Sequence, residues 1–335
     1  MTADPPLTVR GRRLLSRIVI AIAVAAALGA VGWHLLARQI EGQLLAWAEL
    51  RRAEGYSLAW QSLSVTGFPT SFVLTIAQPR LAKDGWSGEA SALHATWLPW
   101  RMDRIDLSAL RLAVTGPDTA VSVEKVSGII TIENGLATQL IVDGNAAAAR
   151  LLTDDLGRAE RARMVIDRFD PATKDWQGES LAGKLTLWQA QPAPPFAAQL
   201  LFPDPFDLEL EGAIKGPIAS LAGWRDAGGT ADFTRLQLAW GPLRLVGDAT
   251  LALDAQMRPL GAGTAKLQGL APVLDRLVAK GQIRAPEASI AKIVLGLLAQ
   301  PTANGSLEVS VPLTAQDGKL FLGPVAVATL KPLAP

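Results

Sequence analysis

Carboxylates are the main catalytic material in this sequence of 335 residues. Asp167, Asp170 and Asp175 fall close together in the segment DRFDPATKD. Two converging carboxylates with separated pKa values could serve a hydrolase as general acid and base, and three could hold calcium. The glycine and the terminal glutamate of an EF-hand loop are missing, however, and aspartates in such segments commonly cap polar turns. We therefore expect no metal and no cofactor, and a carboxylate hydrolase is the least favoured of three functional interpretations.

Histidine and thiol chemistry is nearly absent from the chain. There are two histidines and no cysteine. His34 lies in an apolar run, and His94 has no neighbouring partner that the sequence identifies. A serine triad would need a nucleophile elbow, which is missing, and a zinc site would need more imidazole or thiolate ligands. The sequence therefore predicts a protein without a catalytic site.

Tryptophan is the remaining residue type that could form a binding surface. The chain has ten tryptophans against one tyrosine. Most such residues fill cores, with one N–H to satisfy. Trp97 and Trp100 flank a proline that breaks a strand, and Phe68 lies in a Gly-Phe-Pro turn. These three residues are the predicted ligand or partner surface.

The N-terminal segment predicts where these residues are placed. Arg10, Arg12, Arg13 and Arg17 precede an uncharged run at 18–37. This length suits one membrane-spanning helix, and the arginines favour a cytoplasmic N-terminus. The competing interpretation is a cleaved signal peptide.

The division that we expect is a cytoplasmic segment 1–13, a transmembrane helix 14–37 in the inner membrane, and a periplasmic remainder. Without cysteines, that remainder must be held together by burial rather than by disulfides. The formal net charge of +1 hides an asymmetry, because Asp and Glu outnumber Lys and Arg beyond residue 38. This slightly acidic, mixed surface argues against nucleic acid as a partner.

The exported part changes from a helical to a two-residue period. An amphipathic juxtamembrane helix is expected at 38–54, followed by β-rich regions at 55–190 and 206–335. In the second region Phe206, Leu208 and Leu210 alternate with acidic residues, a pattern typical of a strand with one dry face. A Pro-rich connection at 191–205 separates the two regions.

Helices are expected where proline stands in a first turn. They fall at 217–227, 272–280 and 286–299, and the last two form a helical hairpin at 272–299. The predicted fold class is mainly β: elongated, curved antiparallel sheet with a few covering helices, preceded by one transmembrane helix.

A set of turn sequences suggests a family. They are Gly67-Phe68-Pro69, Trp240-Gly241-Pro242-Leu243, Pro259-Leu260-Gly261, Asp317-Gly318-Lys319-Leu320 and Leu322-Gly323-Pro324. Together with the N-terminal anchor, they resemble the envelope family of Gram-negative, chiefly alphaproteobacterial, species known as domain of unknown function 2125. The resemblance covers nearly the whole chain and implies no catalytic residues. A more distant analogy is to AsmA-like and LptC-like periplasmic proteins, in which a curved sheet exposes an apolar face to acyl chains.

Two non-catalytic functions remain open at this point. The first is a periplasmic module that binds or transfers lipid or another amphiphile, favoured by the anchor and by the hydrophobic fraction of 49%. The second is an envelope scaffold that docks on partner proteins through sheet edges or through Trp97 and Trp100. The geometric criterion between them is whether the inward residues of the strands meet another layer.

Overall fold

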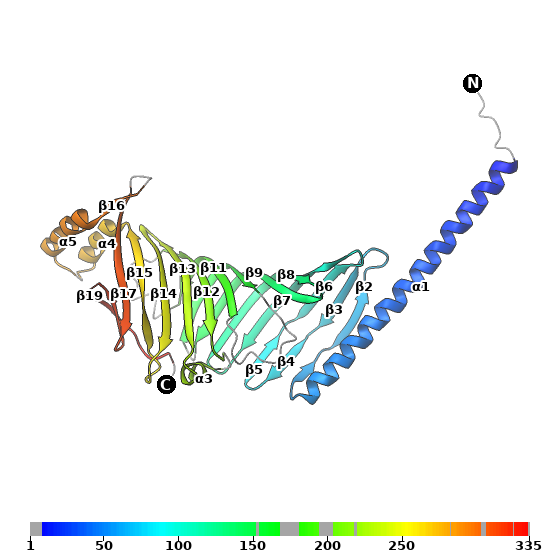
Figure 1. The fold of residues 1–335 in the computed structure, drawn as a ribbon, viewed down its shortest axis with the longest axis horizontal. Helices are drawn as coiled ribbons and strands as arrows, with labels where there is room; N and C mark the ends of the chain where they lie inside the picture. Colours follow the sequence, from blue (N-terminus) through cyan, green and yellow to red (C-terminus); the bar gives the residue numbers. More distant parts are fainter. Residues whose placement is uncertain are drawn as a thin grey trace, which may run out of the picture.

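A long N-terminal helix leads into one large open sheet in the computed structural model (Figure 1). The structure describes residues 9–151, 154–167, 181–193, 204–217, 220–281, 283–302, 306–323 and 325–333. The fold class predicted from the sequence is confirmed: the antiparallel sheet dominates, it does not close, and helices are few.

Helix α1 (Val9–Ala53) covers both the predicted membrane span and the predicted juxtamembrane helix. Residues 17–29 are all exposed, and the helix is long and apolar enough to cross a membrane. From Trp33 onward one side of α1 is buried against the sheet, with Trp33, Ala37 and Ala48 each less than a tenth exposed. The protein-packed part of α1 therefore begins inside the predicted span.

Nineteen strands are found in the described residues, and all of their pairings are antiparallel. The first ten are β1 (Ser57–Ala59), β2 (Ser62–Thr66), β3 (Phe72–Ala77), β4 (Arg80–Lys83), β5 (Trp86–Glu89), β6 (Ala92–Leu98), β7 (Arg101–Thr115), β8 (Thr119–Glu133), β9 (Leu136–Leu151) and β10 (Asp154–Asp167). The remaining nine are β11 (Leu181–Pro192), β12 (Phe206–Lys215), β13 (Thr230–Trp240), β14 (Leu243–Leu253), β15 (Pro259–Gln268), β16 (Gln300–Pro301), β17 (Leu307–Gln316), β18 (Lys319–Leu322) and β19 (Val325–Thr329).

Strand β7 joins two short ladders to the main sheet. Its first part pairs with β6, which continues to β3 and β2, and its last part pairs with β5, which continues to β4 and β1. Helix α1 lies along β1 and β2 and forms hydrogen bonds with both strands. The Glu41 carboxylate accepts from the Val65 amide at 2.8 Å, and Arg52 donates to the Leu58 carbonyl. The helix therefore covers an edge that would otherwise be free to pair with another chain.

Three shorter helices follow in the described residues, at places close to those predicted. They are α3 (Leu221–Asp226), α4 (Leu270–Ala279) and α5 (Ala285–Leu298). Ser220 begins α3, because its hydroxyl accepts from the Gly223 amide at 3.1 Å. At the start of α5 the Glu287 carboxylate accepts from the Arg284 amide at 3.0 Å, and proline occupies the first turn.

The predicted Pro-rich connection at 191–205 does not interrupt the sheet. Strands β11 and β12, on either side of it, pair directly with each other, for example Leu185 with Leu210. Residues 194–203 of the connection lie outside the described residues, as do Asp170 and Asp175.

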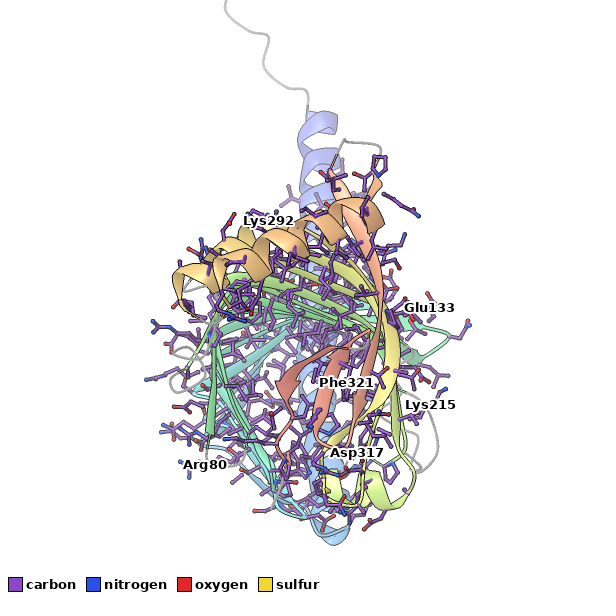
Figure 2. All side chains as sticks on the ribbon, turned by 90° about the vertical axis from the view of Figure 1, so that its left-hand side faces the viewer. Arg80, Glu133, Lys215, Lys292, Asp317 and Phe321 are labelled. Carbon is purple, nitrogen blue, oxygen red and sulfur yellow. The ribbon has the colours of Figure 1, made fainter. Side chains whose placement is uncertain are left out.

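A line of left-handed residues crosses the first half of the sheet and bends it. Arg111 in β7, Ala146 in β9 and Gln189 in β11 have φ values of 50°, 51° and 51°. One such residue in a strand shifts the alternation of side chains by one position. Leu112 accordingly packs in the same cluster as Ala109, although a regular strand would place residues three apart on opposite faces. Viewed along the long axis, the sheet curves with Glu133, Lys215 and Arg80 on its outer side (Figure 2).

Candidate ligand-binding surface

One row of directly opposed residues runs across ten strands of the sheet and contains no polar side chain. We call it the apolar row. Directly opposed residues share a face of the sheet. In sheet order from β7 to β17 its members are Leu107, Gly128, Val142, Met164, Leu185, Leu210, Leu236, Gly247, Ala265 and Val311.

The sequence neighbours of these ten residues form a second row, in which every residue except Val246 is polar or charged. In the same order this polar row consists of Ser108, Ser127, Asp143, Arg163, Thr186, Glu209, Gln237, Val246, Lys266 and Ser310. Its charges pair with partners on the same face, with N–O distances of 2.6 Å for Arg163 with Asp143 and for Lys184 with Glu209. Lys215, on this face of β12, points outward in Figure 2, so the polar row is convex and the apolar row is concave.

Between its two ends the apolar row is not covered by a second layer in the part of the chain that the structure describes. Gly128 and Ala265 are buried, whereas the larger side chains keep contact with solvent, and Met164 is 40% exposed. Helix α1 packs on β1 and β2, and α5 packs on β17, at the two ends of the sheet. Burying one leucine or methionine side chain is worth about 1.5–3 kcal/mol, so an open apolar face of this extent favours a ligand or a partner.

Helix α3 connects the two margins of the curved sheet, and we call this contact the α3 bridge. The end of β12, which precedes α3, pairs with the start of β11, as Ile214 with Leu181. This margin of the sheet also holds the end of β10 and the β8–β9 turn. Asp118 lies in the β7–β8 turn on the opposite margin, yet its carboxylate accepts from the Leu221 amide at 3.4 Å. Trp224 donates through Nε1 to the Lys215 carbonyl at 2.8 Å and thereby holds the helix on its own margin.

An apolar pocket of about 220 Å³ lies at the α3 bridge and is partly open to solvent. Ile214 and Ala231 line it from one wall, Trp86 and Thr119 from the other, and Leu221 from the helix. By their register, Ile214 and Ala231 belong to the concave face. The pocket is therefore a place where residues of the concave face meet the opposite margin and α3.

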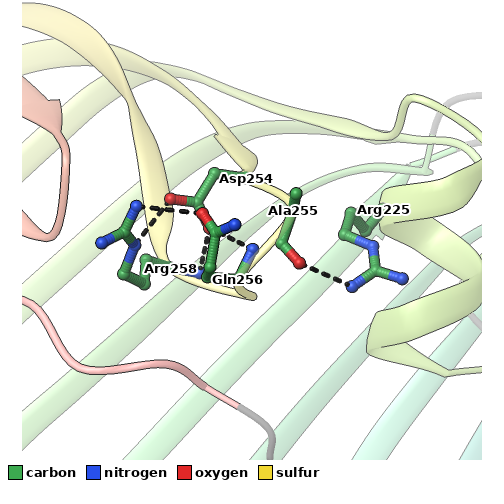
Figure 3. A network of polar contacts seen from close by, with 5 residues as sticks. All are labelled: Arg225, Asp254, Ala255, Gln256 and Arg258. Carbon is green, nitrogen blue, oxygen red and sulfur yellow. Dashed lines mark hydrogen bonds and ion pairs between the residues drawn. The ribbon is translucent and has the colours of Figure 1, made fainter.

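The C-terminal end of α3 is connected to the β14–β15 turn (Figure 3). Arg225 donates to the Ala255 carbonyl at 3.4 Å, next to a turn that is ordered by the Asp254 carboxylate. Burial alone would raise the pKa of Asp254, but hydrogen bonds from Arg258 and the Gln256 amide outweigh it and lower that pKa. The carboxylate is thus ionised and serves to hold the turn.

The predicted hairpin at 272–299 is present as α4 and α5 and covers the distal end of the concave face. A cavity of about 540 Å³ lies between Leu295 of α5 and the strand residues Leu267 and Val309. The other side of α5 is uncovered: Ile290, Ile293 and Leu297 are 63%, 65% and 81% exposed.

The three aromatic residues predicted as a binding surface lie at one end of the sheet but have different surroundings. Trp97 is half-buried and stacks on Phe72 with ring centroids 5.7 Å apart. Trp100 is 67% exposed in the β6–β7 turn, and Phe68 is 48% exposed in the β2–β3 turn. Trp97 is therefore part of the packing, whereas Trp100 and Phe68 are available for contact.

The predicted catalytic candidates show ordinary structural contacts where they are described. The Asp167 carboxylate accepts from the Gln139 amide group at 2.9 Å, and His94 Nδ1 lies 3.0 Å from the Thr75 hydroxyl. No cluster of three metal-ligating side chains is found among the described residues.

Sequence reasoning identified only part of this surface. The alternation at 206–211 indicated Leu208 and Leu210, but it did not single out Leu107, Met164 or Leu185. The same two-residue alternation could have identified them, but the alternation is interrupted in neighbouring strands by the left-handed residues Arg111 and Ala146.

These features define a class of protein: an open antiparallel sheet with an apolar concave face, attached to a helix that is able to span a membrane. Residues 33–331 match the family described as "Uncharacterized protein conserved in bacteria (DUF2125)", and the chain belongs to that family. No curated protein sequence matches the chain significantly. The family match begins at Trp33, the residue at which α1 first becomes buried against the sheet.

Proposed function

We propose that this protein is a membrane-anchored, periplasmic module that binds or transfers a lipid or another amphiphile on the concave face of its sheet. The apolar row is the observation that carries this proposal. Acyl chains need a continuous apolar surface and few polar partners, and the ten residues of the row offer that surface over the width of ten strands.

The location rests on the N-terminal residues. Arg10, Arg12, Arg13 and Arg17 precede the exposed apolar part of α1, so the proposed orientation has the N-terminus in the cytoplasm and the sheet on the other side of the inner membrane. A signal sequence would have the same composition, and retention of α1 is part of the proposal.

The test compares one charge on the two faces of β13. Leu238→Glu adds a carboxylate to the concave face, because Leu238 opposes Leu208 and Leu245. Gln237→Glu adds the same charge one residue away, on the polar row. We expect Leu238→Glu to reduce binding of a fluorescent acyl-chain probe by the full-length protein at least tenfold, since a buried charge without a partner is costly.

Gln237→Glu is expected to retain the affinity of the parent, and thermal melting would check that both variants fold. Native mass spectrometry of the purified full chain should also detect bound lipid. If the parent binds neither lipid nor probe, or if the two variants lose binding equally, the proposal is wrong.

The alternative function is an envelope scaffold without a ligand, and the uncovered side of α5 favours it. An apolar helical surface such as Ile290, Ile293 and Leu297 is a common docking surface. Ile293→Glu together with Leu297→Glu should remove co-purifying envelope proteins and leave probe binding unchanged if the scaffold function is separate. An unchanged set of partners rejects α5 as the docking surface.

A further inference from the structure

The level at which α1 leaves a membrane can be read from its contacts. Trp33 is 8% exposed, its Nε1 donates to the Ser71 carbonyl at 3.1 Å, and its ring stacks on Phe72 at 5.4 Å. The side chains at 17–29, one turn earlier, are free of such packing. Since a packed interface with the sheet replaces lipid from Trp33 onward, the bilayer surface lies close to this residue.

The β2–β3 turn returns to that same level. Going back along α1 from Arg52 to Glu41 to Trp33, its partners in the sheet are Leu58, Val65 and Ser71. Phe68, in this turn, meets the edge of the Trp33 ring at 5.7 Å and stacks on His34 at 6.2 Å. Half of its surface is nevertheless exposed.

The β6–β7 turn lies at the same end of the sheet. Phe72, at the start of β3, pairs with Trp97 near the end of β6, and Leu98 pairs with Arg101 across the turn. Trp100 and Met102 are each 67% exposed there. Three large apolar side chains, Phe68, Trp100 and Met102, thus stand at the level where α1 leaves the bilayer. We call the two turns that carry or adjoin these side chains the interfacial turns.

The charges of the β6–β7 turn are paired within the protein. Arg101 lies 3.7 Å from Asp103, and Arg104 lies 2.6 Å from Asp106. No excess positive charge is therefore offered to anionic head groups at this turn, and contact with a membrane would depend on apolar side chains.

We propose that the interfacial turns insert into the head-group region of the outer leaflet of the bilayer that α1 spans. Aromatic residues prefer this region because their rings are apolar and Trp carries one N–H donor. The proposal rests on the membrane anchoring given under the proposed function. It adds that the sheet itself rests on the leaflet, so that its first strands meet lipid directly.

The absence of cysteine allows a direct test with single-cysteine variants. Trp100→Cys and Leu297→Cys would each be labelled with an environment-sensitive fluorophore in the full-length protein and placed in phosphatidylcholine nanodiscs that contain a head-group-proximal spin-labelled lipid as quencher. Leu297 is the matched control, because it is 81% exposed but lies on α5 at the far end of the sheet (Figure 1). We expect quenching of the Trp100 label to be at least twofold stronger than quenching of the Leu297 label.

Equal quenching of the two labels would overturn the proposal. A second measurement tests the apolar mechanism: neither 0.5 M salt nor anionic lipid should change the quenching at position 100, and a strong loss in salt would contradict insertion. Lipid carriage on the concave face is measured separately by Leu238→Glu. Quenching without carriage would reject the proposed function alone, and carriage without quenching would reject the interfacial turns alone.

Discussion

Two apolar regions of this molecule differ in whether a second layer covers them. The aromatic corner, formed by Trp33, Val65, Phe72 and Trp97, is packed between α1 and the first strands, and Phe72 is only 4% exposed. The apolar row lies on strands of the same sheet and consists of aliphatic residues, methionine and glycine, and its larger side chains remain partly accessible. The corner is thus a core, whereas the row is a surface that remains available.

This difference teaches that alternation alone does not distinguish a core face from a binding face. Phe72–Ala77 and Phe206–Lys215 both alternate, and both place their larger residues on the inner side of the sheet. Only the position of α1 separates their roles, and that position depends on contacts between residues far apart in the sequence.

The largest expected effect comes from truncating the aromatic corner. Phe72→Ala should lower the free energy of unfolding by about 3–5 kcal/mol, because it removes a buried ring and leaves a cavity. Leu236→Ala, on the row, should cost only about 1 kcal/mol, because its side chain is already partly in water. Urea unfolding of the full chain in detergent would measure both. Equal losses would mean that the row is a packed core and would remove the contrast.

A smaller loss of stability is expected from replacing a glycine of the apolar row by alanine. A Cβ added at Gly247 would overlap the Thr264 carbonyl oxygen of the neighbouring strand. Gly247→Ala should therefore destabilise the sheet by about 1–3 kcal/mol through overpacking. Gly88→Ala in β5 is the matched control, since its nearest new contact is the Ala113 carbonyl at 4.0 Å. If Gly247→Ala is as neutral as Gly88→Ala, the strands are not held this closely.

The smallest expected effect is on the stability of the protein at acidic pH and comes from an ion pair on the convex face. The hydrogen bond from Lys215 at 2.6 Å, with help from Thr250, lowers the pKa of Asp232. A folded-state pKa below the ordinary value of about 3.9 stabilises the protein above that pH, and the contribution is lost as the pH falls through the lowered pKa. Melting temperatures between pH 5 and pH 3 should fall less steeply in Asp232→Asn than in the parent. Identical slopes would show that this pair does not contribute.

Much of the fold could be predicted from local residue patterns. The arginines followed by an uncharged run predicted the position of α1, and proline in the first turn predicted α5 within a few residues. The Asn134-Gly135 turn between β8 and β9 follows local residue type too, because both residues take positive φ there and Asn and Gly tolerate that conformation.

The bend of the sheet and the α3 bridge could not be predicted in this way. Arg111, Ala146 and Gln189 are not residue types that signal a left-handed conformation, so their line across the strands has no local marker. The approach of Asp118 to Leu221 joins residues more than a hundred positions apart, and nothing near either residue specifies it. The candidate surface was therefore predictable in composition but not in extent.

The α3 bridge would restrict how a ligand moves along the concave face of the sheet. At that point Asp118 and Leu221 join the two margins of the sheet across its concave face. Under the proposed lipid function, an acyl chain beneath the α3 bridge would leave the concave face along the long axis of the sheet rather than sideways. The ligand would then move along the sheet in one dimension, and the position of α3 would limit the width of the ligand that can pass beneath it.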